Sequence, residues 1–464
     1  MNWIIFIFLI SFAGLILTLS IIPERSFIEI LSIGFALGIF FITFTSFILL
    51  SLDRPLSFNF IVLTTYAFLI LSLIFGGKNF INKIENKRLF IYRLKEYFSS
   101  EKLIYKLILI STTLLFVFII IIAVYWPITD WDALALYDLR GRLLSQGYLF
   151  NDLAKLDRFD PNNPGYYFSY PLLTSIFHAQ IYLLGGRSPQ VLYPLTFILL
   201  GLFFYSTIKK RSGNYAIFYT YLFIFTPNIL RQAIISYTNL IYIFYYFLST
   251  VILSEILANK SNRSQLGAMF ISGILLGGSI WSRSVEPFYL VNILFLLFWI
   301  IKNKQGYIYF PAYIFFPLLV RYLWKNTALK YANSFFINSL NINIFAKVLA
   351  NFKIEYMLEA IKIILLFLQD NIILFALLST VGLISLLQYK SKVIKSDFLR
   401  ITATIFMMDM VVLFLGTLIV SIEFQERKEI FDSISRTGLF IYPFSYLLVA
   451  IGNPLEKMIV KNKH

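Results

Sequence analysis

The sequence predicts an all-α polytopic membrane protein, and both its composition and its hydropathy pattern lead to that prediction. Of the 464 residues, 59% are hydrophobic and only 14% are charged, which is far from the balance of a soluble protein. Apolar runs of roughly 17–25 residues recur from end to end, and a helix of that length crosses the hydrocarbon core of a bilayer. The chain contains no cysteine, which excludes disulfides and thiolate metal sites.

Thirteen apolar segments qualify as transmembrane helices by length and composition. They cover residues 2–22, 27–52, 59–76, 104–126, 189–208, 214–228, 239–258, 265–281, 286–301, 307–324, 371–388, 400–421 and 437–453. The first segment lacks a basic n-region and a small-residue cleavage site, so we expect a retained span rather than a signal peptide. No internal repeat divides the chain, and we expect residues 1–464 to form a single membrane domain.

Basic residues set the expected orientation of these spans. The loop at residues 77–103 carries seven Lys and Arg residues, so the positive-inside rule places it in the cytoplasm and residues 127–188 outside. Residues 171–185 form a short segment for a crossing and include His178 and Gln180, so we expect a helix at the outer interface. The later basic loops then all fall inside and the N-terminus lies outside. This arrangement accounts for the formal net charge of +16 without nucleic acid as a partner.

The first outer loop gathers three acids at the membrane edge. Asp130, Asp132 and Asp138 lie in the stretch PITDWDALALYDLRGRLLSQG, directly after the fourth apolar run. Leucines recur there at helical spacing and polar residues follow the opposite face, which predicts an amphipathic helix along the membrane surface. The leucines are Leu136, Leu139 and Leu143, and the polar residues are Asp138, Arg142 and Ser145. We expect this helix to start at Asp130 or Asp132, to contain Gly141 and to end near Gly147.

A purely structural explanation covers part of this acidic set. One of Asp130 and Asp132 can cap the helix, and Asp138 can pair with Arg142 four residues later. A cap needs only one acid, so the other acid is left without a structural task. Further along the loop, the segment YPLL that starts at Tyr170 supplies a proline suited to the first turn of the next short helix.

The order of motifs along the chain resembles the GT-C superfamily of integral-membrane glycosyltransferases. In particular it resembles the family 39-type branch, which includes protein O-mannosyltransferases and lipid A aminoarabinose transferases. The matching motifs are DWDALALYDLRGRLLSQG, YYFSYPLLTSIFHAQIYLLGG, SYTNLIYIFYYFLS, WSRSVEPF and SRTGLFIYPFSYLLVA. They cover the first outer loop and the following spans better than the last third of the chain. The chain departs from the family pattern in its three spans before the acidic loop and in Asn239, which stands in place of an acid.

The resemblance implies a GT-C-like fold and the transfer of a sugar from a polyprenyl-phosphate-linked donor. The acceptor would be a lipid, a glycan or a protein of the cell envelope, on the extracytoplasmic face of the cell membrane. The resemblance also implies a catalytic core at residues 104–324. Extra spans and a basic loop at residues 1–103 would precede it, and an outer loop with C-terminal spans at residues 325–464 would follow it.

Such a transfer needs a general base for the acceptor hydroxyl and cations for the leaving lipid phosphate. The spacing to Gly147 fits the family pattern best for Asp132 as the base, with Asp130 as the second choice and Asp138 as the third. Guanidinium groups suit the phosphate because they bind two oxygens at once. The expected substrate- and phosphate-binding residues are Arg436, Arg283, Arg142, Asp138, Tyr170, Asn239 and Glu286.

We expect no essential metal and no other cofactor. Mg²⁺ or Mn²⁺ would suit carboxylates beside a phosphate, but a dedicated site needs several oxygen ligands, and only Asp130 and Asp132 are close in sequence. With no cysteine and only two histidines, a zinc site made of protein ligands is not expected. We expect His178 to be an interfacial or substrate-loop residue rather than a ligand.

Simpler and rival interpretations stay open at this point. Arg283 can pair with Glu286, and Arg436 can extend to the lipid headgroups. A lipid-linked sugar flippase or transporter would be favoured by ionisable residues at the bilayer midplane or by inverted repeats, and the sequence indicates neither. A polysaccharide polymerase or ligase of related architecture would rely on Arg and His rather than on an early aspartate.

Overall fold

The structure is a computed structural model of the whole chain. It describes residues 1–85, 103–156, 170–259, 265–283, 286–304, 306–331, 353–370, 376, 397–423, 431 and 434–452. Within these described residues the chain is helical and contains no strand, and nine helices are long and apolar enough to cross a membrane. The prediction of an all-α polytopic membrane protein is therefore confirmed.

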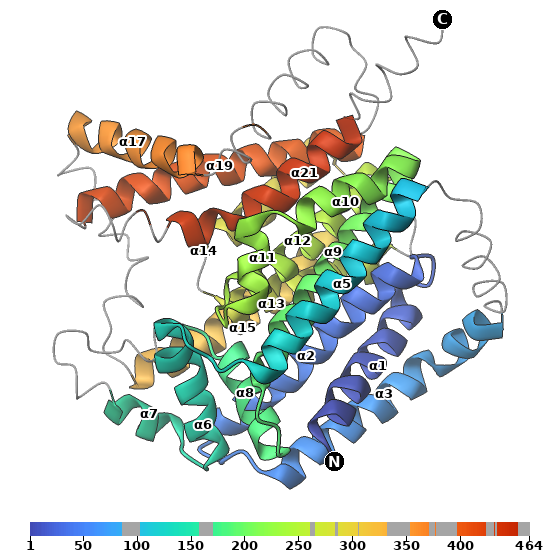
Figure 1. Cartoon of the computed structure of the whole chain (residues 1–464), viewed down its shortest axis with the longest axis vertical. Helices are drawn as coiled ribbons and strands as arrows, with labels where there is room; N and C mark the ends of the chain where they lie inside the picture. Colours follow the sequence, from blue (N-terminus) through green and yellow to red (C-terminus); the bar gives the residue numbers. More distant parts are fainter. Residues whose placement is uncertain are drawn as a thin grey trace, which may run out of the picture.

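The long helices match most of the predicted spans (Figure 1). They are α1 (Trp3–Ile21), α2 (Phe27–Ser51), α3 (Phe58–Glu85), α5 (Leu103–Tyr125), α9 (Leu192–Ser212), α12 (Asn239–Ala258), α13 (Gln265–Ser282), α14 (Glu286–Asn303), α15 (Tyr309–Tyr331), α19 (Asp397–Glu423) and α21 (Ile441–Gly452). The shorter helices are α6 (Leu139–Ser145), α7 (Phe150–Leu156), α8 (Leu173–Leu183), α10 (Ala216–Ile224), α11 (Pro227–Ile234) and α17 (Ile354–Asp370).

The count of thirteen spans is not reached among the described residues. The predicted helix at residues 214–228 is broken in two, because α10 ends at Ile224 and Pro227 starts the separate helix α11. Helices α14 and α15 form as predicted but are not among the nine candidate spans, and residues 371–388 lie outside the described residues. The predicted outer loop at residues 325–370 is also partly wrong, since α15 extends to Tyr331 and α17 follows and packs along α19 (Figure 1).

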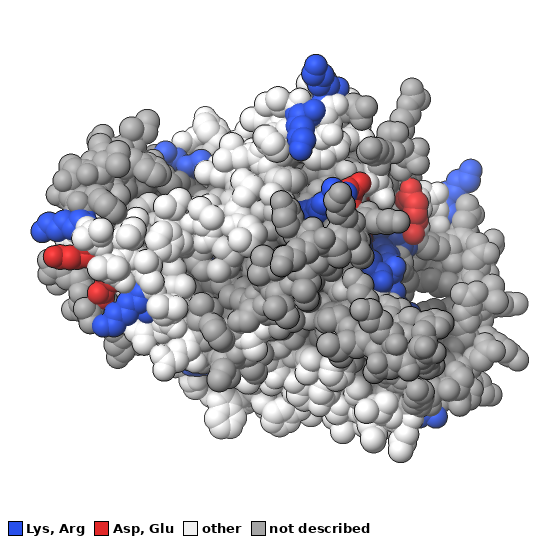
Figure 2. Space-filling model, turned by 90° about the horizontal axis from the view of Figure 1, so that it is seen from above, with Lys and Arg blue, Asp and Glu red and all other residues white. Residues whose placement is uncertain are grey.

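Ion pairs join helix ends and loops that lie far apart in the sequence, at two different ends of the bundle. At the basic end, Glu255 accepts hydrogen bonds from Arg25 at 2.7 Å and from Arg211 at 2.8 Å. At the other end, Lys330 pairs with Asp53 at 3.7 Å. The segments that meet at each end are therefore those that the expected orientation places on the same side of the membrane. Figure 2 shows few charged side chains among many uncharged ones on the face it presents, as expected for helices in lipid.

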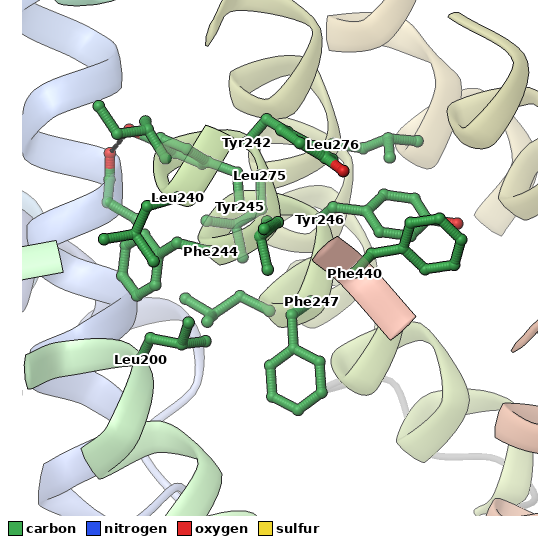
Figure 3. Packing of buried hydrophobic residues seen from close by; sticks show 14 of the residues in the cluster. Leu200, Leu240, Tyr242, Phe244, Tyr245, Tyr246, Phe247, Leu275, Leu276 and Phe440 are labelled. Carbon is green, nitrogen blue, oxygen red and sulfur yellow. Dashed lines mark hydrogen bonds between the residues drawn. The ribbon is translucent and has the colours of Figure 1, made fainter. Parts of the chain in front are cut away.

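Helix α12 forms the centre of the core. All of its 20 residues except Glu255 and Ala258 are buried, and it packs against α9, α13 and α19. Figure 3 shows its aromatic side chains among leucines of neighbouring helices and Phe440, which precedes α21. Neighbouring helices therefore surround α12 along almost its whole length and fix the position of its first residues. Its first residues lie beside the acidic loop, where the candidate site is built.

Candidate functional site

The acidic loop contains a π-helical turn that changes which side chains point inward. The turn, η1, runs from Ala133 to Asp138, and the Leu139 N–H donates to the Leu134 carbonyl five residues back. A π-turn inserts one extra residue into the helical repeat, so the residues after it rotate relative to an α-helix. Asp138, the last residue of the turn, is only 1% exposed, because η1 packs against α8. The prediction that Asp138 lies on an exposed polar face is wrong.

The capping role expected for one of the first two acids does not appear in the described geometry. Asp132 stands at the N-cap position of η1, but its side chain makes no capping hydrogen bond. The Asp130 carbonyl accepts from the Leu134 N–H at 2.9 Å, which starts the helix through the main chain. The Asp130 side chain makes no hydrogen bond or ion pair to any other residue that the structure describes. Neither carboxylate is therefore used for capping.

Asp132 instead contacts Arg436. Arg436 Nη1 donates to Asp132 Oδ2 at 2.5 Å, which joins the first outer loop to the segment just before α21. The pair is only partly shielded, since the Asp132 side chain is 19% exposed and that of Arg436 is 29% exposed. The guanidinium carbon of Arg436 also lies 5.2 Å from the centre of the Tyr237 ring. The structure thus brings together the expected base and one of the expected phosphate-binding residues.

Arg283 belongs to the same neighbourhood. It follows α13, and its guanidinium carbon lies 5.8 Å from the centre of the Tyr242 ring. The Tyr242 hydroxyl donates to the carbonyl of Thr437, the residue next to Arg436. Tyr242 thereby links the guanidinium group of Arg283 to the short segment that carries Arg436.

Tyr137 and Tyr170 form the wall of this region on the side of the acidic loop. Their rings meet edge to face, with centres 6.2 Å apart, and the Tyr137 hydroxyl lies 3.2 Å from Thr238 Oγ1. Burial, followed by the neighbouring Tyr170, raises the pKa of Tyr137 to about 12 against the opposing positive charge of Arg283. We call the set Asp132, Tyr137, Tyr170, Tyr237, Tyr242, Arg283 and Arg436 the Asp132 site. Its charged members carry two positive charges and one negative charge.

Asp138 and Arg142 form a separate network, which we call the Asp138 network. Arg142 Nε donates to Asp138 Oδ2 at 2.7 Å, so the predicted pairing of these two residues is confirmed. Asp138 Oδ1 accepts from the Tyr182 hydroxyl and lies 3.3 Å from Nδ1 of His178. Burial alone would raise the pKa of Asp138, but the hydrogen bonds and charge of His178, with those of Tyr182 and Arg142, lower it to about 2.

His178 does not occupy the position expected from the sequence. The short helix at residues 171–185 is present as α8, but its residues from Leu173 to Ile181 are buried between α2 and α6. His178 is fully buried, and its Nε2 lies 3.4 Å from the Tyr193 hydroxyl. The interfacial or substrate-loop role predicted for His178 is therefore wrong, because α8 is covered by the acidic loop.

Two other expected residues do not join the Asp132 site. Asn239 is buried at the start of α12, and its Nδ2 donates to Gln232 Oε1 at 3.1 Å. The Glu286 side chain lies outside what the structure describes, so its predicted pairing with Arg283 stays a prediction. Within the described part of the chain, no group of three or more His, Asp or Glu residues could hold a metal ion.

Sequence reasoning missed two kinds of residue. Tyr237 and Tyr242 contact the guanidinium groups of the Asp132 site, but a chain with 30 tyrosines gives no signal that distinguishes them. The second kind is Asp409, a single acid inside the apolar run IFMMDMVVLF of α19. That signal was present in the sequence, and the expectation of no ionisable residue at the bilayer midplane overlooked it, since Asp409 lies near the middle of the candidate span Asp397–Ile419. Comparison of the chain with protein-family models, with curated proteins and with solved structures gives no match.

Proposed function

We propose that this chain is a membrane glycosyltransferase that moves a sugar from a polyprenyl-phosphate-linked donor to an acceptor hydroxyl at the Asp132 site. The observation that carries the proposal is the contact of 2.5 Å between Asp132 and Arg436, with Arg283 linked to the same segment. A carboxylate beside two guanidinium groups combines a proton acceptor with a place for a phosphate. The positive-inside rule puts this end of the bundle on the extracytoplasmic face.

In the proposed reaction, the donor phosphate replaces Asp132 as the partner of Arg436. A donor phosphate binds Arg436 through two oxygens and competes with Asp132 for that guanidinium. The released carboxylate accepts the proton of the acceptor hydroxyl as the acceptor oxygen forms a bond to the anomeric carbon. The bond from that carbon to the phosphate oxygen breaks, and the polyprenyl phosphate leaves with the electron pair. Arg436 and Arg283 stabilise the charge that develops on the leaving phosphate.

The test is sugar transfer in proteoliposomes supplied with undecaprenyl phosphate that carries a radiolabelled hexose. We expect Asp132→Asn to reduce the rate roughly 10²–10⁴-fold, the usual contribution of a general base. Asp152→Asn is the matched control, because Asp152 is an exposed acid of the same loop that pairs with Lys155. Arg436→Lys keeps the charge but loses the bidentate contact, so KM for the donor should rise more than kcat falls.

Different outcomes would reject the choice of Asp132 as the base and the proposal that the chain is a glycosyltransferase. Normal transfer by Asp132→Asn with loss of transfer in Asp130→Asn would move the base to Asp130. Failure of the unaltered protein to transfer a sugar from any polyprenyl-phosphate donor would reject the glycosyltransferase class.

A second candidate function, transport of a lipid-linked sugar, is favoured by the buried acid Asp409 in the middle of α19. Movement of the intact labelled donor across the vesicle membrane without transfer would support that alternative.

A further inference from the structure

Asp409 is a buried acid that neither the Asp132 site nor the Asp138 network uses. It lies on α19 about 18 Å along the axis from Asp397 and about 21 Å from Glu423, at 1.5 Å per residue. Its exposed fraction is 0%. The surrounding helix qualifies as a membrane span from Asp397 to Ile419. An acid at that depth is expensive and therefore a candidate for function.

The carboxyl group of Asp409 has one close hydrogen-bond partner. The Tyr246 hydroxyl of α12 lies 2.8 Å from Asp409 Oδ1 and 2.9 Å from Oδ2, and also 3.3 Å from the Phe288 carbonyl of α14. Rings of Phe440 and Phe444 pack on Tyr246 with centres 6.4 Å and 6.0 Å away. Figure 3 shows Phe440 beside Tyr246. Tyr246 is therefore fixed in place among aromatic rings, and its hydroxyl faces both the acid and a main-chain acceptor.

No cation balances Asp409 in the described part of the chain. The titratable groups that interact with it electrostatically are all tyrosines: Tyr242 and Tyr246 of α12, and Tyr313 of α15. Helices α14, α17 and α21 also pack on α19, and none of their described charged groups forms an ion pair with Asp409. A buried carboxylate without a counter-ion is strongly unfavourable, and one tyrosine hydroxyl does not neutralise it.

The hydrogen-bond geometry accommodates two states of this acid. When Asp409 carries a proton, its O–H donates to the Tyr246 oxygen, and the Tyr246 O–H donates to the Phe288 carbonyl. When Asp409 is ionised, the Tyr246 O–H turns to the carboxylate and leaves that carbonyl. Both arrangements use the same heavy atoms, so one proton binds or leaves without movement of a helix.

We propose that Asp409 is a proton-binding site in the membrane core, with the Tyr246 hydroxyl as the partner that reorients when the proton leaves. One helical turn away on α12, the hydroxyl of Tyr242 contacts Thr437 beside the Asp132 site. Polar side chains continue from Tyr246 in the other direction as well, since Thr250, one turn further along α12, hydrogen-bonds Tyr246 and accepts a hydrogen bond from Asn292 at 2.8 Å. The proposal does not depend on sugar transfer, and it holds whether the chain is an enzyme or a transporter.

The test uses dicyclohexylcarbodiimide, an apolar reagent that modifies protonated carboxyl groups inside membranes. The purified full-length chain in detergent is treated over a range of pH, and the adduct is located by peptide mass spectrometry. We expect modification of Asp409 at acidic pH that declines as pH rises. Asp397 on the same helix, exposed and paired with Arg400 at 2.6 Å, is the internal control and should stay unmodified at neutral pH.

Two variants distinguish a proton-binding site from a static hydrogen bond. Tyr246→Phe removes the donor that stabilises the ionised form, so modification of Asp409 should persist about one to two pH units higher. Asp409→Asn keeps a hydrogen bond to Tyr246 and should fold but show no adduct.

Infrared spectra provide a measurement of the protonated acid that does not depend on reagent access. The C=O band of a protonated carboxylic acid should be present in the unaltered chain and missing in Asp409→Asn. Absence of that band at every pH, or modification of Asp409 that does not change with pH, would overturn the proposal.

Discussion

The contact between α6 and α8 at Gly141 gives a prediction that connects packing with the candidate site. A Cβ atom at Gly141 would lie 2.6 Å from the Cβ of His178 and 3.0 Å from the Ser175 carbonyl oxygen. Carbon atoms pack at about 3.5–4.0 Å, so alanine would push the two helices roughly 1 Å apart. The distance from His178 Nδ1 to Asp138 Oδ1 is already 3.3 Å, and such a shift would break that hydrogen bond.

The expected loss in stability follows from these terms. Overpacking costs about 1–3 kcal/mol, and a lost hydrogen bond to a charged group costs about 1.5–3 kcal/mol. The higher helix propensity of alanine returns about 1 kcal/mol. We therefore expect Gly141→Ala to destabilise the chain by roughly 1.5–5 kcal/mol and to lower the midpoint of thermal unfolding in detergent.

Gly416→Ala is the matched control for this measurement. Gly416 lies inside α19, and a Cβ there would meet no atom within 4 Å. The control variant should be as stable as the unaltered chain or slightly more stable. If Gly141→Ala unfolds at the same temperature as Gly416→Ala, then α6 and α8 do not pack as closely as described, and the argument that α8 positions the acidic loop fails.

Three further predictions concern the ion pairs and the orientation. The folded pKa of Asp138 is about 2 against an ordinary value of 3.8, so its stabilisation is present above about pH 4 and is lost as pH falls toward 2. Asp138→Asn should cost about 2 kcal/mol at pH 7 but little near pH 2 in unfolding experiments. Glu255→Gln leaves two guanidinium groups facing each other and should cost roughly 3–5 kcal/mol of unfolding free energy by denaturant titration. In this cysteine-free chain, a membrane-impermeant maleimide should label Ser57→Cys from outside and Asn303→Cys only after permeabilisation; the reverse pattern would contradict the orientation.

The helices could be predicted from the sequence because lipid imposes one dominant requirement on them. A span needs enough apolar residues to cross the bilayer, and that length is visible in a single sequence. The predicted boundaries of α1, α2 and α12 accordingly agree with the structure to within two residues. The break inside the predicted helix at residues 214–228 was missed because its composition is apolar throughout, while Pro227 within it starts a second helix.

The environment of each acid was much harder to predict. Helical periodicity assumes 3.6 residues per turn, and the π-turn at Ala133–Asp138 breaks that assumption where the acids lie. The partner of Asp132 is 304 residues away, and no local pattern reports a contact of that kind. Asp409 was overlooked for another reason. The other charges cluster at helix ends, and one acid within a long apolar run hardly changes its hydropathy.

The environments of the three acids indicate which of them is suited to proton transfer. Asp138 is buried, accepts from Arg142 and Tyr182, contacts His178, and has its pKa lowered to about 2, so it is a poor proton acceptor. Asp130 contacts none of the cations that the structure describes. It therefore has no guanidinium group beside it that could bind the donor phosphate. Asp132 is partly exposed and is paired with an arginine that a phosphate can draw away. Asp138 and Asp132 therefore have separate tasks, since Asp138 holds α8 through His178 and Tyr182 while Asp132 faces Arg436.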